Sequence, residues 1–424
     1  MNFILIYFLF EVFSFTYDVI VNHMVDKQRA LPLPDEVSDV YDTKRYTTFL
    51  KYKSDTRKHN NQFSVIYTCI RFGLIFVGGY KWIDTIGGNN EYLVVLYSSL
   101  LTFVLTLPLD YYKSYLFTFK IADKYNLNKK TKKEFNKDFI LSEIPTEIIG
   151  ILAIFLLIGI VQFISNSNLY PMTPLKAFMI AAIVAVIIVI ASLLITLISL
   201  FIFRKTYTFT DMEDNELKHK IYDLLEGVKK KIYHIYVYDE SKKSISKNAF
   251  VLHFLFYREI SIADNFLNEN AEEELLAVLS HEVGHLKHKK TILEYLSYVD
   301  IVLLFCLLTY CIYNPVLLKQ FVSWINASFG IQTTNYVLLV IAISTFLRPI
   351  SFLISLYTNY ISRVNEYEAD QNAVKEGYGE ALIKTFKTLS NDELVDVNPC
   401  KLVEISEYNH PGMTNRIRAI RKSL

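Results

Sequence analysis

Long apolar stretches recur along the chain and are separated by charged segments. Seven of them are long enough to cross the hydrocarbon core of a bilayer, which takes about 17–25 helical residues. Within the fifth stretch, residues 177–203 contain no charged side chain. The pattern therefore predicts seven transmembrane helices, at residues 2–21, 64–80, 92–108, 146–165, 176–203, 293–313 and 335–357.

The first stretch is interrupted by Glu11 and Asp18. It lacks the basic start and the small-residue cleavage site of a secretory signal peptide, so we expect it to be retained as a helix. Helices of soluble proteins are seldom apolar on every face. With 52% hydrophobic residues, the chain is predicted to be an integral membrane protein and not a soluble protein with buried helices.

Basic residues are distributed unevenly between the segments that connect the predicted helices. Four segments are rich in lysine and arginine: 22–63, 111–143, 204–292 and the tail after 358. The other three connections contain only Lys81 and Lys319 as basic residues. Because basic loops remain in the cytosol, the large loops and the C-terminus are predicted to be cytosolic and the N-terminus lumenal.

The overall charge is nearly balanced, with 44 basic and 43 acidic residues. A nucleic-acid-binding protein needs a basic excess, so no nucleic-acid partner is expected. The four cysteines are scattered and include no C-x-x-C pair. Neither a cysteine metal site nor a disulfide scaffold is therefore predicted.

A short metal-binding motif lies ahead of the sixth predicted span. The polar residue Asn270 and the glutamates after it predict the start of a helix that contains His281, Glu282 and His285. Residues four apart share one helical face, so the two histidines can bind one zinc ion. Glu282 is turned about 100° from His281, which suits a general base better than a ligand. The motif favours a catalytic zinc site over incidental histidines on a solvated helix.

A catalytic zinc ion needs a third protein ligand and an open fourth position. His288 is on the next turn of the same helix, and one straight helix does not easily place three ligands around an ion. Glu366, in the segment SRVNEYEAD after the last span, is the better candidate. Asp370 shares its face and would orient a histidine ligand or assist proton transfer. Spacing alone leaves open a charged juxtamembrane helix, and Glu368 is expected to face solvent.

The predicted topology brings the two halves of this site together. The helix with the two histidines runs almost directly into the sixth span, and the Glu366 helix continues from the seventh. Spans joined by a short loop are usually neighbours, so both halves emerge on the same cytosolic side. The zinc ion is therefore expected close to the membrane plane, where it suits a lipid-anchored substrate.

With these motifs, the chain resembles the integral-membrane zinc CAAX prenyl proteases of the eukaryotic endoplasmic reticulum. The resemblance extends over nearly the whole chain and is specific in the order of its elements. They are Asp26-Lys27-Gln28-Arg29, Leu107-Pro108, Tyr125-Asn126-Leu127-Asn128, Asn248-Ala249-Phe250, the HEVGH helix, SRVNEYEAD, and Tyr408-Asn409-His410-Pro411 with Arg416.

The resemblance implies an all-α membrane protein in which seven transmembrane helices enclose a chamber, with a mainly helical cytosolic zinc-protease domain that carries a small β-hairpin. We expect four segments: helices one to five in 1–203, the loop with the HExxH helix in 204–292, helices six and seven in 293–357, and the helical C-terminal region in 358–424. Ionisable residues in or near the spans should face the interior or pair, because exposure to lipid is costly: Arg71, Glu143, Glu147, Asp300 and Arg348.

The resemblance also assigns roles in the site. It implies one zinc ion per chain, with three ligands: His281, His285 and Glu366. The implied catalytic residues are Glu282 as general base, Asp370 and His410. The implied substrate-binding residues are Asn248, Ala249 and Arg416. Residues 249–257 (AFVLHFLFY) form an apolar, strand-like segment whose edge would bind an extended peptide, and His410 or Arg416 would stabilise the oxyanion.

Such enzymes remove the last three residues from C-terminal Cys-aliphatic-aliphatic-X sequences after the cysteine is prenylated. The expected function is therefore CAAX processing at the endoplasmic reticulum membrane, with a prenylated protein and the bilayer as partners. One alternative is a quality-control zinc protease of the bacterial heat-shock type, which has fewer spans. Another is a seven-span transporter or receptor with an incidental metal site, against which the intact Glu282 and Glu366 argue.

Overall fold

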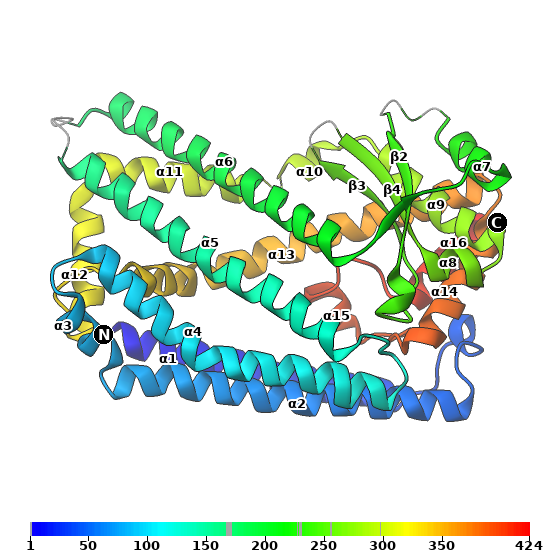
Figure 1. Cartoon of the computed structure of the whole chain (residues 1–424), viewed down its shortest axis with the longest axis horizontal. Coiled ribbons are helices and arrows are strands. Elements are labelled where there is room, and N and C mark those ends of the chain that lie inside the picture. The colour runs from blue at the N-terminus through cyan, green and yellow to red at the C-terminus, as the bar shows by residue number, and fades with distance from the viewer. Residues whose placement is uncertain (1, 167–171, 227, 229–230, 255–256, 297) are drawn as a thin grey trace.

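The computed structural model describes residues 2–166, 172–226, 228, 231–254, 257–296 and 298–424. Long helices lie along the long axis of the molecule, and a small sheet gathers with the C-terminal helices at one end (Figure 1). Among these residues, five helices are long and apolar enough to cross a membrane: α1 (Phe3–Arg29), α4 (Glu91–Leu116), α5 (Lys132–Asn166), α6 (Pro174–Thr206) and α13 (Tyr336–Lys375).

Two further predicted spans fall within bent pairs of helices, and the second pair includes residues 315–329, which were predicted to belong to a connection. The chain bends by 55° between α2 (Thr43–Phe76) and α3 (Gly79–Gly87), and Gly78 adopts a left-handed φ of 72° at that bend. The bend between α11 (Val299–Tyr313) and α12 (Pro315–Phe329) is 95°. With each bent pair taken as one span, the described residues contain up to seven spans. The predicted mostly helical membrane protein is thus confirmed.

Helix α13 is the element that links the membrane to the candidate site. At about 1.5 Å per residue, its 40 residues extend about 60 Å, roughly twice the thickness of a hydrocarbon core. It begins at Tyr336, near the predicted start of the seventh span, and continues unbroken past residue 357. Its last five turns, about 3.6 residues each, therefore project beyond the span and carry Glu366 and Asp370.

The sheet has four strands in the order β1 (Phe209–Asp211), β2 (His234–Tyr238), β4 (Tyr257–Ala263) and β3 (Ala249–Phe254). Strands β3 and β4 are antiparallel and form the expected hairpin, but β2 adds parallel to β4 and β1 antiparallel to β2. The sheet is therefore larger than the predicted hairpin. Within the described residues, β3 pairs on one side only and is an edge strand.

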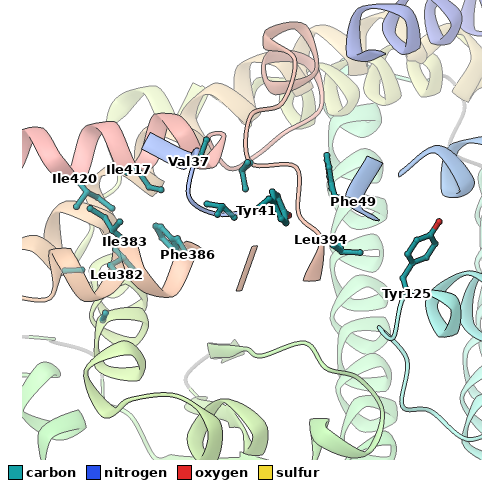
Figure 2. Close-up of a cluster of buried hydrophobic side chains, with 14 of the residues drawn as sticks. Val37, Tyr41, Phe49, Tyr125, Leu382, Ile383, Phe386, Leu394, Ile417 and Ile420 are labelled. Carbon is teal, nitrogen blue, oxygen red and sulfur yellow. The ribbon is translucent and has the colours of Figure 1, made fainter. Parts of the chain in front are cut away.

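Further helices, most of them short, complete the fold. They are η1 (Asp35–Val37), η2 (Phe117–Ala122), α7 (Glu216–Leu224), η3 (Glu240–Lys242), α8 (Asp264–Glu269), α9 (Glu272–Lys287), α10 (Ile292–Leu296), α14 (Gly379–Glu393), α15 (Lys401–Ser406) and α16 (Met413–Ser423). Figure 2 shows the apolar cluster that joins the C-terminal helices to the segments before α2, with Phe386 and Ile417 near Val37 and Tyr41. The Tyr41 hydroxyl lies 2.7 Å from the carbonyl oxygen of Ser390. The cluster fixes α14 and α16 against the ends of the membrane helices.

One charged group between the membrane helices is paired, as expected for ionisable residues near lipid. Glu11 of α1 lies 3.3 Å from Arg71 of α2 and 2.8 Å from Arg348 of α13. Glu143 and Glu147 are both partly buried on α5. The side chain of Asp300, which was predicted to behave in the same way, lies outside the described residues.

Candidate metal centre

Helix α9 carries the two histidines. Glu272, Glu273 and Glu274 occupy its first turn, where acidic side chains favour a helix start. The expected capping by Asn270 is wrong, because the cap residue is Ala271. The Asn270 side chain donates a hydrogen bond to the Glu274 carboxylate instead. The helix thus starts one residue later than expected, with the same residues on its faces.

The structure brings His281, His285 and Glu366 together from α9 and α13. Nε2 of His281 lies 3.5 Å from Oε2 of Glu366, and Nε2 of His285 lies 3.3 Å from Oε1. One ligand atom from each residue can be chosen so that all lie within 4.8 Å of one another. Ligands bound to zinc at ~2.0–2.1 Å in a tetrahedron lie ~3.3 Å apart. The two nitrogen–oxygen distances to Glu366 therefore fit a zinc ion.

The burial of Glu366 supports the same interpretation. This residue is 5% exposed, and its Oε2 atom is buried without a hydrogen-bond partner. Nη1 of Arg416 lies 3.3 Å from this oxygen but forms no hydrogen bond with it. A buried carboxylate oxygen without a hydrogen bond is costly, and a metal ion bound to it would remove that cost. The chemistry of the donor set, two imidazoles and one carboxylate, is that of a catalytic zinc site.

A glycine allows α9 and α13 to approach closely. A Cβ atom placed on Gly284 would lie 2.8 Å from Cα of Ala369 and 3.1 Å from Cβ of Asn372. Beside this contact, Asn372 donates a 2.7 Å hydrogen bond to the carbonyl oxygen of Ser280. The small residue between the two motif histidines thus sets the distance between the helices that supply the three donors.

Asp370 and Arg416 form a buried pair behind the donor set. Arg416 donates to both Asp370 carboxylate oxygens, at 2.6 and 2.9 Å. Asp370 lies 3.0 Å from Nδ1 of His281, which suits a carboxylate that orients a histidine ligand. Nη1 of Arg416 is 3.3 Å from Glu366. Burial lowers the pKa of Arg416, but the charge of Asp370 outweighs it and raises that pKa.

The geometry separates His288 from the donor set. Nδ1 of His288 lies 2.7 Å from Glu368, and Nε2 lies 2.6 Å from Glu294. Both ring nitrogens are thus engaged with carboxylates away from Glu366. The Glu368 side chain is 53% exposed, as expected for a residue that faces solvent, and it also contacts His288.

A pocket of about 330 Å³ opens beside the donor set. Nε2 of His410 lies 3.3 Å from Oε1 of Glu366, and burial lowers the pKa of this half-exposed histidine. Burial raises the pKa of Glu282, and the backbone of Val251 in β3 hydrogen-bonds to its carboxylate. The pocket lining includes all the sequence-predicted site residues except Asp370: Asn248, Ala249, His281, Glu282, His285, Glu366, His410 and Arg416.

Some lining residues were not anticipated from the sequence. Lys247, Phe266, Leu389 and Phe386 also contact the pocket. In the sequence, only its position next to Asn248 could have suggested that Lys247 lines the pocket. The aromatic and aliphatic residues come from α8 and α14, which carry no motif, so only the folded chain identifies them.

Comparisons with known proteins identify the family and the fold. The profile of peptidase family M48 matches residues 211–424, and that of the CAAX prenyl protease N-terminal region, five membrane helices, matches residues 22–203. CAAX prenyl protease 1 of Saccharomyces cerevisiae is 27% identical over 90% of this chain and 81% of its own. The uncharacterized metalloprotease YhfN of Bacillus subtilis is 25% identical, over 81% and 74%. The crystal structure of S. mikatae Ste24p shares the fold, with a TM-score of 0.76, 23% identity and 99% of both chains covered.

Proposed function

Since this chain belongs to peptidase family M48 and is therefore a metalloprotease, we propose that it removes the C-terminal tripeptide from prenylated CAAX proteins. The observation that carries the proposal is the junction of α9 and α13, where a helix of the membrane region delivers Glu366 to His281 and His285. Relatives named CAAX prenyl protease 1 span most of the chain, including one in Arabidopsis thaliana at 28% identity over 72% of it. These relatives supply the substrate class.

The chemistry follows from the residues around the donor set. One zinc ion per chain would be held by His281, His285 and Glu366. It would polarise the scissile carbonyl as a Lewis acid and lower the pKa of water, so that the water loses a proton more easily and becomes a better nucleophile. Glu282 reaches the same space and would accept the proton of the attacking water, then pass it to the leaving amine.

Two further groups support this reaction. Asp370 would hold the His281 ring in the orientation needed for a ligand, and Arg416 keeps that carboxylate in place. Nε2 of His410 faces Glu366 from a half-exposed position, and Nδ1 lies 2.7 Å from Oδ1 of Asn409. With a proton on Nε2, the ring would donate a hydrogen bond to the oxyanion. Arg416, expected to contact substrate, is 7% exposed and is bound to Asp370, so we assign it to positioning.

The edge strand β3 would bind the peptide backbone. Its neighbour on one side is β4, and Val251 meets Glu282 on the other side. A peptide in extended conformation can add to such an edge as a further strand. Asn248 and Ala249 at the start of β3 line the pocket, so the backbone groups that hold the peptide lie next to the reacting bond.

We place the enzyme in the endoplasmic reticulum membrane with the site and the C-terminus in the cytosol and the N-terminus in the lumen. Support comes from the lysine- and arginine-rich connections on that side and from the eukaryotic relatives. The partners would be the bilayer and the prenylated substrate, and the net charge of +1 gives no reason to expect nucleic acid. The match to the five-helix N-terminal region favours CAAX processing over the heat-shock type of quality control.

The test is cleavage by the purified protein of a prenylated CAAX peptide and its unprenylated twin. We expect release of the tripeptide from the prenylated peptide, and loss of that activity when a chelator removes the metal. Preference for an unprenylated, unfolded membrane protein would favour the quality-control alternative.

A further inference from the structure

One end of the pocket is occupied by a lysine that no motif includes. The Lys247 side chain is 10% exposed and lines the pocket directly before Asn248. Its ammonium lies 3.3 Å from Glu269 at the end of α8 and 3.4 Å from Asp392 in the last turn of α14. Its backbone N–H donates to the carboxylate of Glu393. A nearly buried cation is thus fixed at the end of the pocket.

Strand β3 and helix α9 run in the same direction past the donor set. Lys247 contacts Glu269, which lies just before α9, whereas Val251 contacts Glu282, three turns along α9. Beyond Lys287 the chain continues through α10 into the apolar helix α11. The Lys247 end of the pocket is therefore the end farther from the membrane.

A prenylated peptide can lie along β3 in one direction only if its lipid is to stay near the bilayer. The modified cysteine must lie toward α10 and α11, and the residues after it must extend toward Lys247. This direction is opposite to that of β3, so the peptide would pair antiparallel, which is the more stable arrangement per residue. Its C-terminus then points at the ammonium group.

We propose that Lys247 binds the terminal carboxylate of the substrate and thereby fixes the distance from the C-terminus to the cleaved bond. The inference rests on the proposed function and adds to it a carboxylate subsite. Lys247 lies four residues before Val251, about 13 Å along an extended strand, and three residues of a bound peptide span about 10 Å. A carboxylate held near Lys247 therefore places the third bond from the C-terminus beside Glu282.

The present partners of Lys247 leave room for this exchange. Charge-assisted hydrogen bonds are usually about 2.7–2.9 Å long, so the contacts with Glu269 and Asp392 are loose. Both carboxylates are partly exposed, at 52% and 39% of the side chain. An ammonium group has three donors, and water can solvate the two carboxylates when the substrate arrives. The other cation among the described pocket residues, Arg416, is held by Asp370.

The experiment compares a farnesylated CAAX peptide that has a free carboxylate with the same peptide as a C-terminal carboxamide. For the wild-type enzyme we expect kcat/KM to be about tenfold or more higher for the carboxylate, the size of one charge-assisted hydrogen bond. Lys247→Met should cleave both peptides at similar rates, and Lys247→Arg should restore the preference. Lys384→Met removes an exposed lysine whose partner is Glu274, outside the pocket, and should keep the full preference.

A second variant separates binding from a merely structural role. Asp392→Asn removes a competing anion, so it should raise kcat/KM for the carboxylate peptide alone. If Lys247 only ties α8 to α14, this variant would instead slow both peptides equally, which would overturn the inference. Equal cleavage of both peptides by the wild type, or a preference that survives Lys247→Met, would also overturn it. Cleavage of neither peptide by zinc-loaded enzyme would overturn the proposed function itself.

Discussion

Arg416 holds Asp370 through two hydrogen bonds, and Asp370 in turn lies 3.0 Å from Nδ1 of His281. The chain of contacts ties a residue of the last helix to a metal ligand on α9. Asp370→Asn keeps the shape of the side chain but removes its charge. We expect zinc affinity to fall about 10–100-fold, as is typical when the partner of a metal-binding histidine is lost. Competition with a chelator measures the affinity, and an unchanged value would contradict the assigned orienting role.

Glu282→Gln separates the base from the ligands. The amide cannot accept the proton of water, so turnover of the prenylated peptide should fall by about 10²–10⁴-fold. Because Glu282 lies beside the donor set and is not part of it, zinc content should remain that of the wild type. Elemental analysis and a peptide-release assay on the same preparation check both halves. Wild-type turnover in a zinc-loaded variant would remove Glu282 from the mechanism.

Two alanine variants on the same helix discriminate between the histidines. His285→Ala should lose bound zinc and activity together, because it removes one of the three donors. His288→Ala is its matched control, since this ring contacts Glu294 and Glu368 instead. That variant should retain zinc. Loss of metal in His288→Ala and retention in His285→Ala would reverse the assignment of ligands.

The close approach at Gly284 predicts a large effect from one methyl group. Gly284→Ala places a Cβ 2.8 Å from Cα of Ala369, so α9 and α13 must move apart. Such overpacking costs about 1–3 kcal/mol. We expect a lower midpoint of thermal unfolding and weaker zinc binding. In Gly150→Ala, the control, the new Cβ meets no heavy atom within 4 Å, and stability should not fall.

Zinc affinity should depend on pH through His285. Burial lowers the pKa of His285, but the hydrogen bond and charge of Glu366 outweigh it, so the pKa lies above the ordinary 6.5 in the metal-free protein. In the metal-free protein, the contact between the protonated His285 ring and Glu366 contributes its full stabilisation below pH 6.5. This stabilisation is lost as the pH rises through the raised pKa of His285. Zinc must displace the proton from His285 in order to bind. As the pH is lowered, the zinc affinity should therefore begin to decrease before pH 6.5 is reached. Isothermal titration at several pH values tests this; a pH-independent affinity between 6 and 8 would contradict it.

The apolar pattern predicted the membrane helices well, because burial in lipid requires long stretches without charge. It did not predict the bend at Gly78, since hydropathy records length and not direction. It also placed α12 in the connection after residue 313 and so missed that helix. Strands β1 and β2 were missed for a different reason. They are three and five residues long, and the pairing of β2 with β4 joins residues far apart in the sequence.

In the candidate site, the spacing of the motif was enough to bring His281 and His285 to one face, and the segment after the last span supplied Glu366. The sequence could not show that Arg416 would be buried against Asp370, because that contact depends on the packing of α16 against α13. The place of Lys247 in the site could not be predicted from the sequence for the same reason. Its significance lies in the ends of α8 and α14, which meet there only in the folded protein.

The contact at Gly284 also has a mechanical consequence. A helix that crosses a bilayer changes its tilt when the lipid thickness changes. At about 25 Å beyond Pro349, a tilt of 5° in α13 would displace Glu366 by about 2 Å, more than a metal site tolerates. Because α9 is packed directly against α13 at Gly284, the two helices would move together as one rigid body. A thicker membrane would then change the distance between the active site and the lipid headgroups, while the geometry of the three metal ligands would stay the same.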